Sequence, residues 1–247
     1  MFERFLIKWY TFRLKRFPDS YYEYLNEYNS YYLGLDNQMQ TRFKTRLYIT
    51  KKFIKFKPVK TQSVTAEMQI LILSAWVQMT FGLEKYVFRR FKTIYVLPHA
   101  YSFAQYEALL GHVDYKANVI CLSWPSVQEG FIIPNDASNV ALHELAHALQ
   151  AENHVRSVFS KIFNEIDYRK FNELGVKKLF KIREKRHKYL RAYAGNNMIE
   201  FFAVCIETFF EQPDKFNDHL PDLFAVMVNL LKQDPRIADR PPVNTEV

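Results

Sequence analysis

Three residues on one short stretch, His143, Glu144 and His147, have the types and the spacing to bind a metal ion and move a proton. They form an H-E-x-x-H motif inside residues 139–150, where apolar residues recur at helical spacing. Residues four apart lie one above the other on a helix, so both imidazoles can point at one position. Two imidazoles make half of a tetrahedral zinc site, and the glutamate can take a proton from a zinc-activated water. A surface helix with two incidental histidines is the alternative.

The motif lacks a third metal ligand. The extended metzincin form requires Gly at position 150 and His at position 153, but this chain has Gln150 and Asn153, so that class is excluded. The third ligand must therefore come from another element, and several glutamates later in the chain remain open: Glu165, Glu173, Glu184, Glu200, Glu207 and Glu211. Glu200 begins an apolar helix, although its position three residues after Asn197 also fits a capping box.

The elements that must position the motif are mostly helical. Residues 65–81 are apolar nearly all round, which indicates a buried core helix rather than a membrane span. Further helices are predicted within residues 21–32, 38–57, 177–191, 197–211 and 221–232, and strands at 93–97, 111–114 and 118–123. We therefore expect an α+β fold, mostly helical and zincin-like, with a small mixed β-sheet beside the motif helix. Asp136 and Ser138 are the candidate N-caps of that helix.

The composition is that of a folded protein with a sizeable core, since 49% of its 247 residues are hydrophobic. Only 6 glycines are present, and no dinucleotide-binding or P-loop pattern occurs. The two cysteines, Cys121 and Cys205, lie in apolar runs, which indicates buried free thiols. This usage fits a reducing compartment, so we expect a cytoplasmic protein.

All of the formal net charge of +8 lies in residues 1–60, which hold 13 Lys and Arg against 5 Asp and Glu. We therefore expect a basic, aromatic-rich helical elaboration at residues 1–60. The H-E-x-x-H motif lies in what we expect to be a zinc peptidase domain at 61–237, followed by a tail at 238–247. Residues 1–17 form either an amphipathic helix packed on the domain or a segment that contacts a membrane surface. Nucleic-acid binding is not expected, because residues 61–247 carry no net charge.

Three sequence blocks carry a resemblance to a known family. They are Asn139-x-x-x-His143-Glu144-x-Ala146-His147-x-Leu149; Ala192-Tyr193-Ala194 followed by Glu200-Phe201-Phe202-Ala203-Val204 and Glu207-x-Phe209-Phe210; and Pro221-x-Leu223 with Gln233-Asp234-Pro235. With these blocks the chain resembles the MtfA-type (Mlc titration factor A family) zinc peptidases. The chain departs from the family pattern at Gln150, where members often carry an aspartate.

The resemblance implies that Glu200 is the third ligand of one Zn²⁺ per chain. It also implies that Tyr193 points at the metal and supports the oxyanion. The implied activity is a gluzincin-like metallopeptidase, with Glu144 as general base and a peptide or protein as substrate. Glu207, one heptad after Glu200, either braces a ligand histidine or is a helix-surface carboxylate. The alternative function is a regulatory module that sequesters a protein partner and has weak or vestigial peptidase activity.

Overall fold

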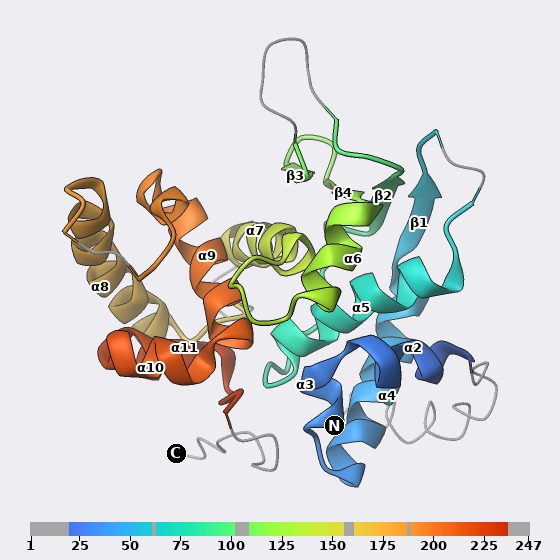
Figure 1. The fold of residues 1–247 in the computed structure, drawn as a ribbon, viewed down its shortest axis with the longest axis horizontal. Helices are drawn as coiled ribbons and strands as arrows, with labels where there is room; N and C mark the ends of the chain where they lie inside the picture. The colour runs from blue at the N-terminus through green and yellow to red at the C-terminus, as the bar shows by residue number, and fades with distance from the viewer. Residues whose placement is uncertain (1–19, 61–62, 102–108, 156–160, 187–188, 237–247) are drawn as a thin grey trace.

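The helix that carries the motif, α7 (Val140–Val155), runs through the middle of the molecule (Figure 1). The computed structural model describes residues 20–60, 63–101, 109–155, 161–186 and 189–236. A small sheet with α5 and α6 lies on one side of α7, and α8 to α11 lie on the other. The predicted α+β architecture, mostly helical with a small mixed sheet beside the motif helix, is confirmed.

The remaining helices fall into two groups along the chain. Before α7 come α2 (Ser20–Tyr28), α3 (Ser30–Leu33), α4 (Asn37–Phe53), α5 (Ala66–Thr80) and α6 (Trp124–Ile132). After it come α8 (Glu165–Arg183), the 3-10 helix η3 (Ala192–Gly195), α9 (Met198–Glu211), α10 (Pro213–His219) and α11 (Pro221–Leu231). The first group contacts α7 through α5 and α6, and the second contacts it through α9.

The sheet has four strands in the order β1-β2-β4-β3. Its strands are β1 (Lys55–Pro58), β2 (Thr93–Leu97), β3 (Gly111–Asp114) and β4 (Val119–Ser123). The strands β1, β2 and β4 are parallel to one another. The edge strand β3 pairs antiparallel with β4, and Gly111 lies opposite Leu122. On β2 and β4 alternate residues are buried, which gives one face to the core. The antiparallel edge strand β3 contacts α7, so this edge borders the motif.

The motif helix is capped by Asn139 rather than by either predicted residue. The Asn139 side-chain oxygen accepts a hydrogen bond from the Leu142 N–H at 3.1 Å. Its side-chain nitrogen donates to the Gly130 carbonyl at 2.9 Å, which ties the start of α7 to α6. The predicted caps Asp136 and Ser138 are wrong because Asp136 instead accepts from the Ser138 N–H, two residues further on, in the turn before the helix.

Several segments differ from the predicted elements. The helix predicted at residues 21–32 is two helices, α2 and α3, because Asn29 is extended and caps α3. The helix predicted at residues 38–57 ends at Phe53, because Ile54 is extended and the Lys55 N–H donates to the Lys92 carbonyl, where β1 starts to pair with β2. The charged helix predicted at 177–191 is α8, which begins earlier at Glu165. Its start is fixed by Asn164, whose side-chain oxygen accepts from the N–H groups of the first turn.

Both thiols are free, as predicted, and Cys205 is buried. The predicted burial of Cys121 is wrong, because its side chain lies on the less buried face of β4, between the buried residues Ile120 and Leu122. Among the described residues no helix is long and apolar enough to cross a membrane. The segment 1–17 and the tail 238–247 lie outside the described residues, so their predicted roles stay predictions.

Among the glycines, Gly82 leaves the least room for a side chain. A Cβ there would overlap the backbone carbonyl oxygens of Leu231 and Lys232, where α11 ends against the end of α5. We expect Gly82→Ala to lower the free energy of unfolding by about 1–3 kcal/mol, because backbone atoms cannot move aside as a side chain can. Urea unfolding measures the change. The control is Gly34→Ala at an exposed helix end with φ of −73°, and an equal effect in both variants would contradict the account.

Candidate metal centre and active site

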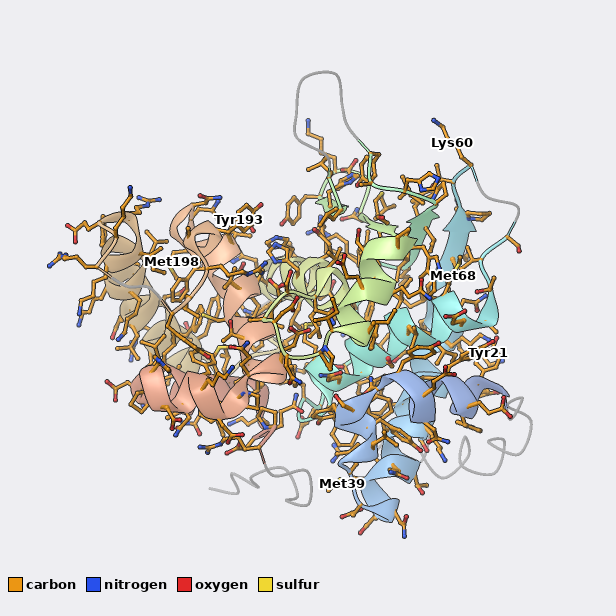
Figure 2. All side chains as sticks on the ribbon, viewed as in Figure 1. Tyr21, Met39, Lys60, Met68, Tyr193 and Met198 are labelled. Carbon is orange, nitrogen blue, oxygen red and sulfur yellow. The ribbon has the colours of Figure 1, made fainter. Side chains whose placement is uncertain are left out.

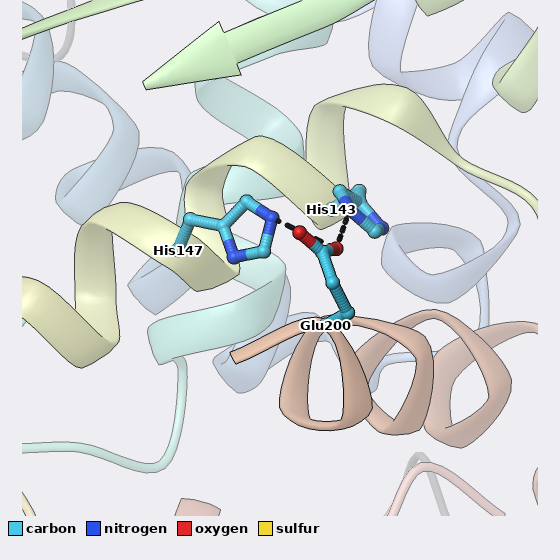
Figure 3. Close-up of side chains that lie close together, drawn as sticks. All are labelled: His143, His147 and Glu200. Atoms are coloured by element: carbon cyan, nitrogen blue, oxygen red, sulfur yellow. Dashed lines mark hydrogen bonds and ion pairs between the residues drawn. The ribbon is translucent and has the colours of Figure 1, made fainter. Parts of the chain in front are cut away.

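Two histidines from α7 and one glutamate from α9 converge on one point (Figure 3). The Glu200 Oε2 lies 3.0 Å from the His143 Nε2 and 3.3 Å from the His147 Nε2. A tetrahedral centre with bonds of about 2.0–2.2 Å separates neighbouring ligand atoms by roughly 3.3–3.6 Å, so the two spacings are slightly shorter than, but close to, those of such a centre. The three side chains could therefore hold one metal ion, with a fourth position left for another ligand.

His147 does not have the surroundings of a satisfied core histidine. Its side chain is 7% exposed, and within the described part of the chain its Nδ1 has no hydrogen-bond partner. Its Nε2 lies 3.3 Å from the Glu200 Oε2. Nε2 is therefore the nitrogen that faces the candidate metal position, and Nδ1 lacks the second hydrogen bond that a ligand histidine usually makes.

Glu200 is held where α9 begins. The Asn197 side-chain oxygen accepts from the N–H groups of Ile199 and Glu200 at 2.9 and 3.0 Å, so Asn197 is the N-cap. The Glu200 carboxylate does not form the reciprocal bond of a capping box but lies against the two imidazoles. Burial raises its pKa, but hydrogen bonds from His143 and His147 outweigh burial and lower the pKa to about 2.

Glu207 lies two turns after Glu200 and is 1% exposed, so it is not a helix-surface carboxylate. Its Oε1 is 2.6 Å from the His143 Nδ1 and 2.5 Å from an Arg191 guanidinium nitrogen. Its Oε2 accepts from the Asn139 N–H at 2.8 Å. Burial lowers the pKa of His143, but hydrogen bonds to Glu200 and Glu207 raise it more, to about 10. A bond at Nδ1 leaves Nε2 directed at the metal position.

Glu144 lies against the edge strand of the sheet. Its side chain is 7% exposed, and burial raises the pKa of its carboxyl. A Cβ at Gly111 of β3 would come within 2.7 Å of the Glu144 Cγ. A residue without a side chain is therefore required where β3 passes Glu144.

Tyr193 lies on η3, just before α9, on the same side of the molecule as Met198 at the start of that helix (Figure 2). Its ring centre is 5.8 Å from that of His143, and the residue is 50% exposed. Burial and then the Glu200 carboxylate raise the pKa of the phenol, so it stays protonated at neutral pH. Arg183 fixes this turn, because its guanidinium donates to the carbonyls of Gly195 and Asn196, both at 2.6 Å.

The other glutamates left open by the sequence do not reach the metal position. Glu165, Glu173 and Glu184 are exposed, on α8 or at its end. Glu211 is buried but accepts from the Ser138 N–H at 2.9 Å. Within the described part of the chain, the His143, His147 and Glu200 group has the spacing for a metal ion.

Apart from Glu207, the sequence prediction missed the residues that hold the ligands in place. Arg191 directly precedes the Ala192-Tyr193-Ala194 block, and its guanidinium joins Glu207 to the Ser138 hydroxyl at 3.2 Å. Glu211 lies four residues after Glu207 and therefore on the same face of α9. That spacing was a usable signal for Glu211, whereas nothing local marks Arg191 as a partner of a carboxylate 16 residues away.

Glu211 predicts a pH dependence of stability. Burial raises the pKa of its carboxyl from 4.5 to about 8. A raised folded-state pKa stabilises the fold below the unfolded-state value, and this contribution is lost as the pH rises toward about 8. We expect the free energy of unfolding to fall less steeply between about pH 5 and pH 8 in Glu211→Gln than in the wild type. Urea unfolding across this range measures it, with the exposed Glu173→Gln as control, and equal slopes in all three proteins would contradict it.

Comparison with known proteins agrees with this geometry. The family described as glucose-regulated metallo-peptidase M90 matches residues 6–232. An uncharacterized protein of Synechocystis sp. is 21% identical over 226 aligned residues, and the match covers 85% of this chain and 82% of that protein. The family match confirms the predicted resemblance to MtfA-type peptidases. The chain belongs to the M90 family of glucose-regulated metallopeptidases.

Proposed function

We propose that this chain is a zinc-dependent peptidase, with one zinc ion per chain and a water molecule as the nucleophile. The observation that carries the proposal is the convergence of His143, His147 and Glu200 beside Glu144. Two imidazoles and one carboxylate with an open fourth position are a donor set typical of catalytic zinc. Bound there, zinc polarises a peptide carbonyl and lowers the pKa of a water molecule toward neutrality.

In this proposal Glu144 moves the proton. It accepts a proton from the attacking water and then passes it to the amine that leaves. The position of Glu144 supports this role, because its carboxyl is close enough to interact electrostatically with His143 and His147, and its side chain lies against Gly111 of β3. Tyr193, beside the His143 ring, donates a hydrogen bond to the oxyanion that develops on the substrate.

Glu207 is a positioning residue in the same proposal. It holds the Nδ1 of His143, and it is held in turn by Arg191 and by the Asn139 N–H. This fixes the imidazole orientation and increases its basicity as a ligand. The carboxylate thereby acts through His143 and not on the substrate.

The edge strand β3 supports a peptide as substrate. It is the edge strand of the described sheet, and its Gly111 lies against Glu144. An extended peptide can add to such an edge through main-chain hydrogen bonds. Peptide bonds paired with β3 would then pass beside the metal position and Glu144.

Glu144→Gln tests the general base. The change is isosteric and leaves the three metal-facing side chains intact, so we expect the zinc content to be unchanged. We expect kcat for peptide hydrolysis to fall by about 10²–10⁴-fold, because general acid–base catalysis contributes an effect of that size. Fluorogenic peptide assays with elemental analysis of the same samples measure both quantities.

The control is Glu173→Gln, the same chemical change at an exposed position on α8. Glu200→Ala should lose stoichiometric zinc, and Glu207→Gln should weaken zinc affinity by about 10–100-fold. Unchanged hydrolysis in Glu144→Gln would remove Glu144 as the base. A wild type that binds zinc but cleaves no peptide would favour the regulatory, partner-binding alternative.

A further inference from the structure

A cavity of about 350 Å³ opens directly beside the metal position. One wall of the cavity is a stripe of α7. The stripe consists of four residues that recur at helical spacing: His147, Gln150, Ala151 and His154. Since His147 also faces Glu200, the cavity is a continuation of the proposed metal site along the same helix face. The other walls are Tyr115 after β3, Tyr168 and Asn172 of α8, and Met198 and Ile199 at the start of α9.

The walls of the cavity are held in place by packing. The Tyr168 ring stacks on Phe163 with ring centres 5.5 Å apart, and its hydroxyl accepts from the Gln150 amide at 3.1 Å. Met198 rests over Gly175 of α8, where a Cβ would come within 2.7 Å of its methyl group. The cavity is therefore built from side chains fixed by neighbouring contacts, as a preformed binding site requires.

The chemistry of the walls selects an uncharged side chain. None of the described residues that line the cavity is an Asp, Glu, Lys or Arg. A charged side chain entering it would lose hydration without gaining an opposite charge, which is costly. Two tyrosine rings, a methionine and an isoleucine instead offer apolar surface, and Tyr115 and Ile199 are 43% and 46% exposed at its rim. Large apolar or aromatic side chains fill such a space best.

The direction of the edge strand decides which part of a peptide reaches the cavity. Gly111, the first residue of β3, lies against Glu144, and Tyr115, just past its last residue, lines the cavity. A peptide paired antiparallel to β3 runs in the opposite direction along the same edge. Its residues on the amino-terminal side of the scissile bond then lie toward Tyr115.

We propose that this cavity is the specificity subsite for a large, uncharged, apolar or aromatic side chain on the amino-terminal side of the scissile bond. The inference rests on the proposed peptidase function, which it deepens by naming the substrate class. Gln150 is the specificity-determining residue at its polar wall, because its neutral amide is bonded to Tyr168 and supplies no charge.

The first test compares peptides that differ in one side chain and then fills the cavity with the substitution Ala151→Leu. Fluorogenic peptides that differ at this one position, with Phe, Leu, Ala, Glu or Lys, are cleaved by the zinc-loaded protein, and mass spectrometry locates the cut. We expect kcat/KM for the Phe peptide to exceed that for the Ala peptide by about tenfold or more. In Ala151→Leu this ratio should fall to about one, because the larger side chain occupies the space that the Phe side chain would fill. The matched control is Ala225→Leu, on an exposed face of α11, which should keep the wild-type ratio.

The second test changes the charge of the cavity. Gln150→Glu is isosteric and places a carboxylate there, so cleavage of the Lys peptide should rise about tenfold or more relative to the Phe peptide. This variant also serves if Ala151→Leu proves unstable in thermal unfolding. A wild type that cleaves all the peptides equally would overturn the subsite, as would a Phe preference that Ala151→Leu and Gln150→Glu leave unchanged. A preference confined to the carboxyl-terminal side of the cut would overturn it too.

A binding measurement separates failure of the subsite from failure of the peptidase proposal. Fluorescence anisotropy of the labelled peptides with zinc-loaded Glu144→Gln protein reads affinity without turnover. If the wild type cleaves no peptide but the Phe peptide binds about tenfold more tightly than the Ala peptide, and Ala151→Leu removes the difference, the cavity is a binding site and the hydrolytic proposal fails. If peptides are cleaved but binding shows no such difference, the subsite fails and the peptidase proposal stands.

Discussion

The site depends on one buried carboxylate, Glu207, that joins two helices and a loop. It contacts the imidazole of His143 and the start of α7 on one side, and the guanidinium of Arg191 on the other. Because Glu207 is fixed on α9, these contacts set the position of α9 along α7. Glu200 lies two turns earlier on the same face of α9, so the same register brings its carboxylate between the two Nε2 atoms. One buried interaction therefore positions a ligand that it does not touch.

The charge balance of this region favours a cation. Glu144, Glu200 and Glu207 are close enough to influence one another and the imidazole of His143. Arg191 binds Glu207, which accounts for one of the three carboxylates. Burying the remaining carboxylates is costly unless positive charge accompanies them, and protonation of His143 supplies it in the protein alone. A divalent cation in the same place would supply that charge and leave both imidazoles neutral, which is the state in which they bind metals.

The sequence was sufficient for those parts of the fold and site that depend on local pattern. The strand at residues 93–97 and the helix around the H-E-x-x-H motif are short-range periodicities, and both were predicted. The strand β1 was missed because residues 55–58 continue an amphipathic helical pattern, and only the distant pairing with β2 makes them extended. The contacts of Arg191 and Gly111 were missed for the same reason, since each acts on a residue far away in sequence. Glu200 was reached through the resemblance, because spacing alone left six glutamates open.

The most direct test of the account is a crystal structure of the protein purified with zinc, measured on both sides of the zinc absorption edge. We expect one anomalous peak per chain within about 2.0–2.2 Å of the His143 Nε2, the His147 Nε2 and a Glu200 carboxylate oxygen. We also expect Glu207 to remain bonded to the Nδ1 of His143. A peak elsewhere, or no peak at these three side chains in zinc-saturated crystals, would contradict the account.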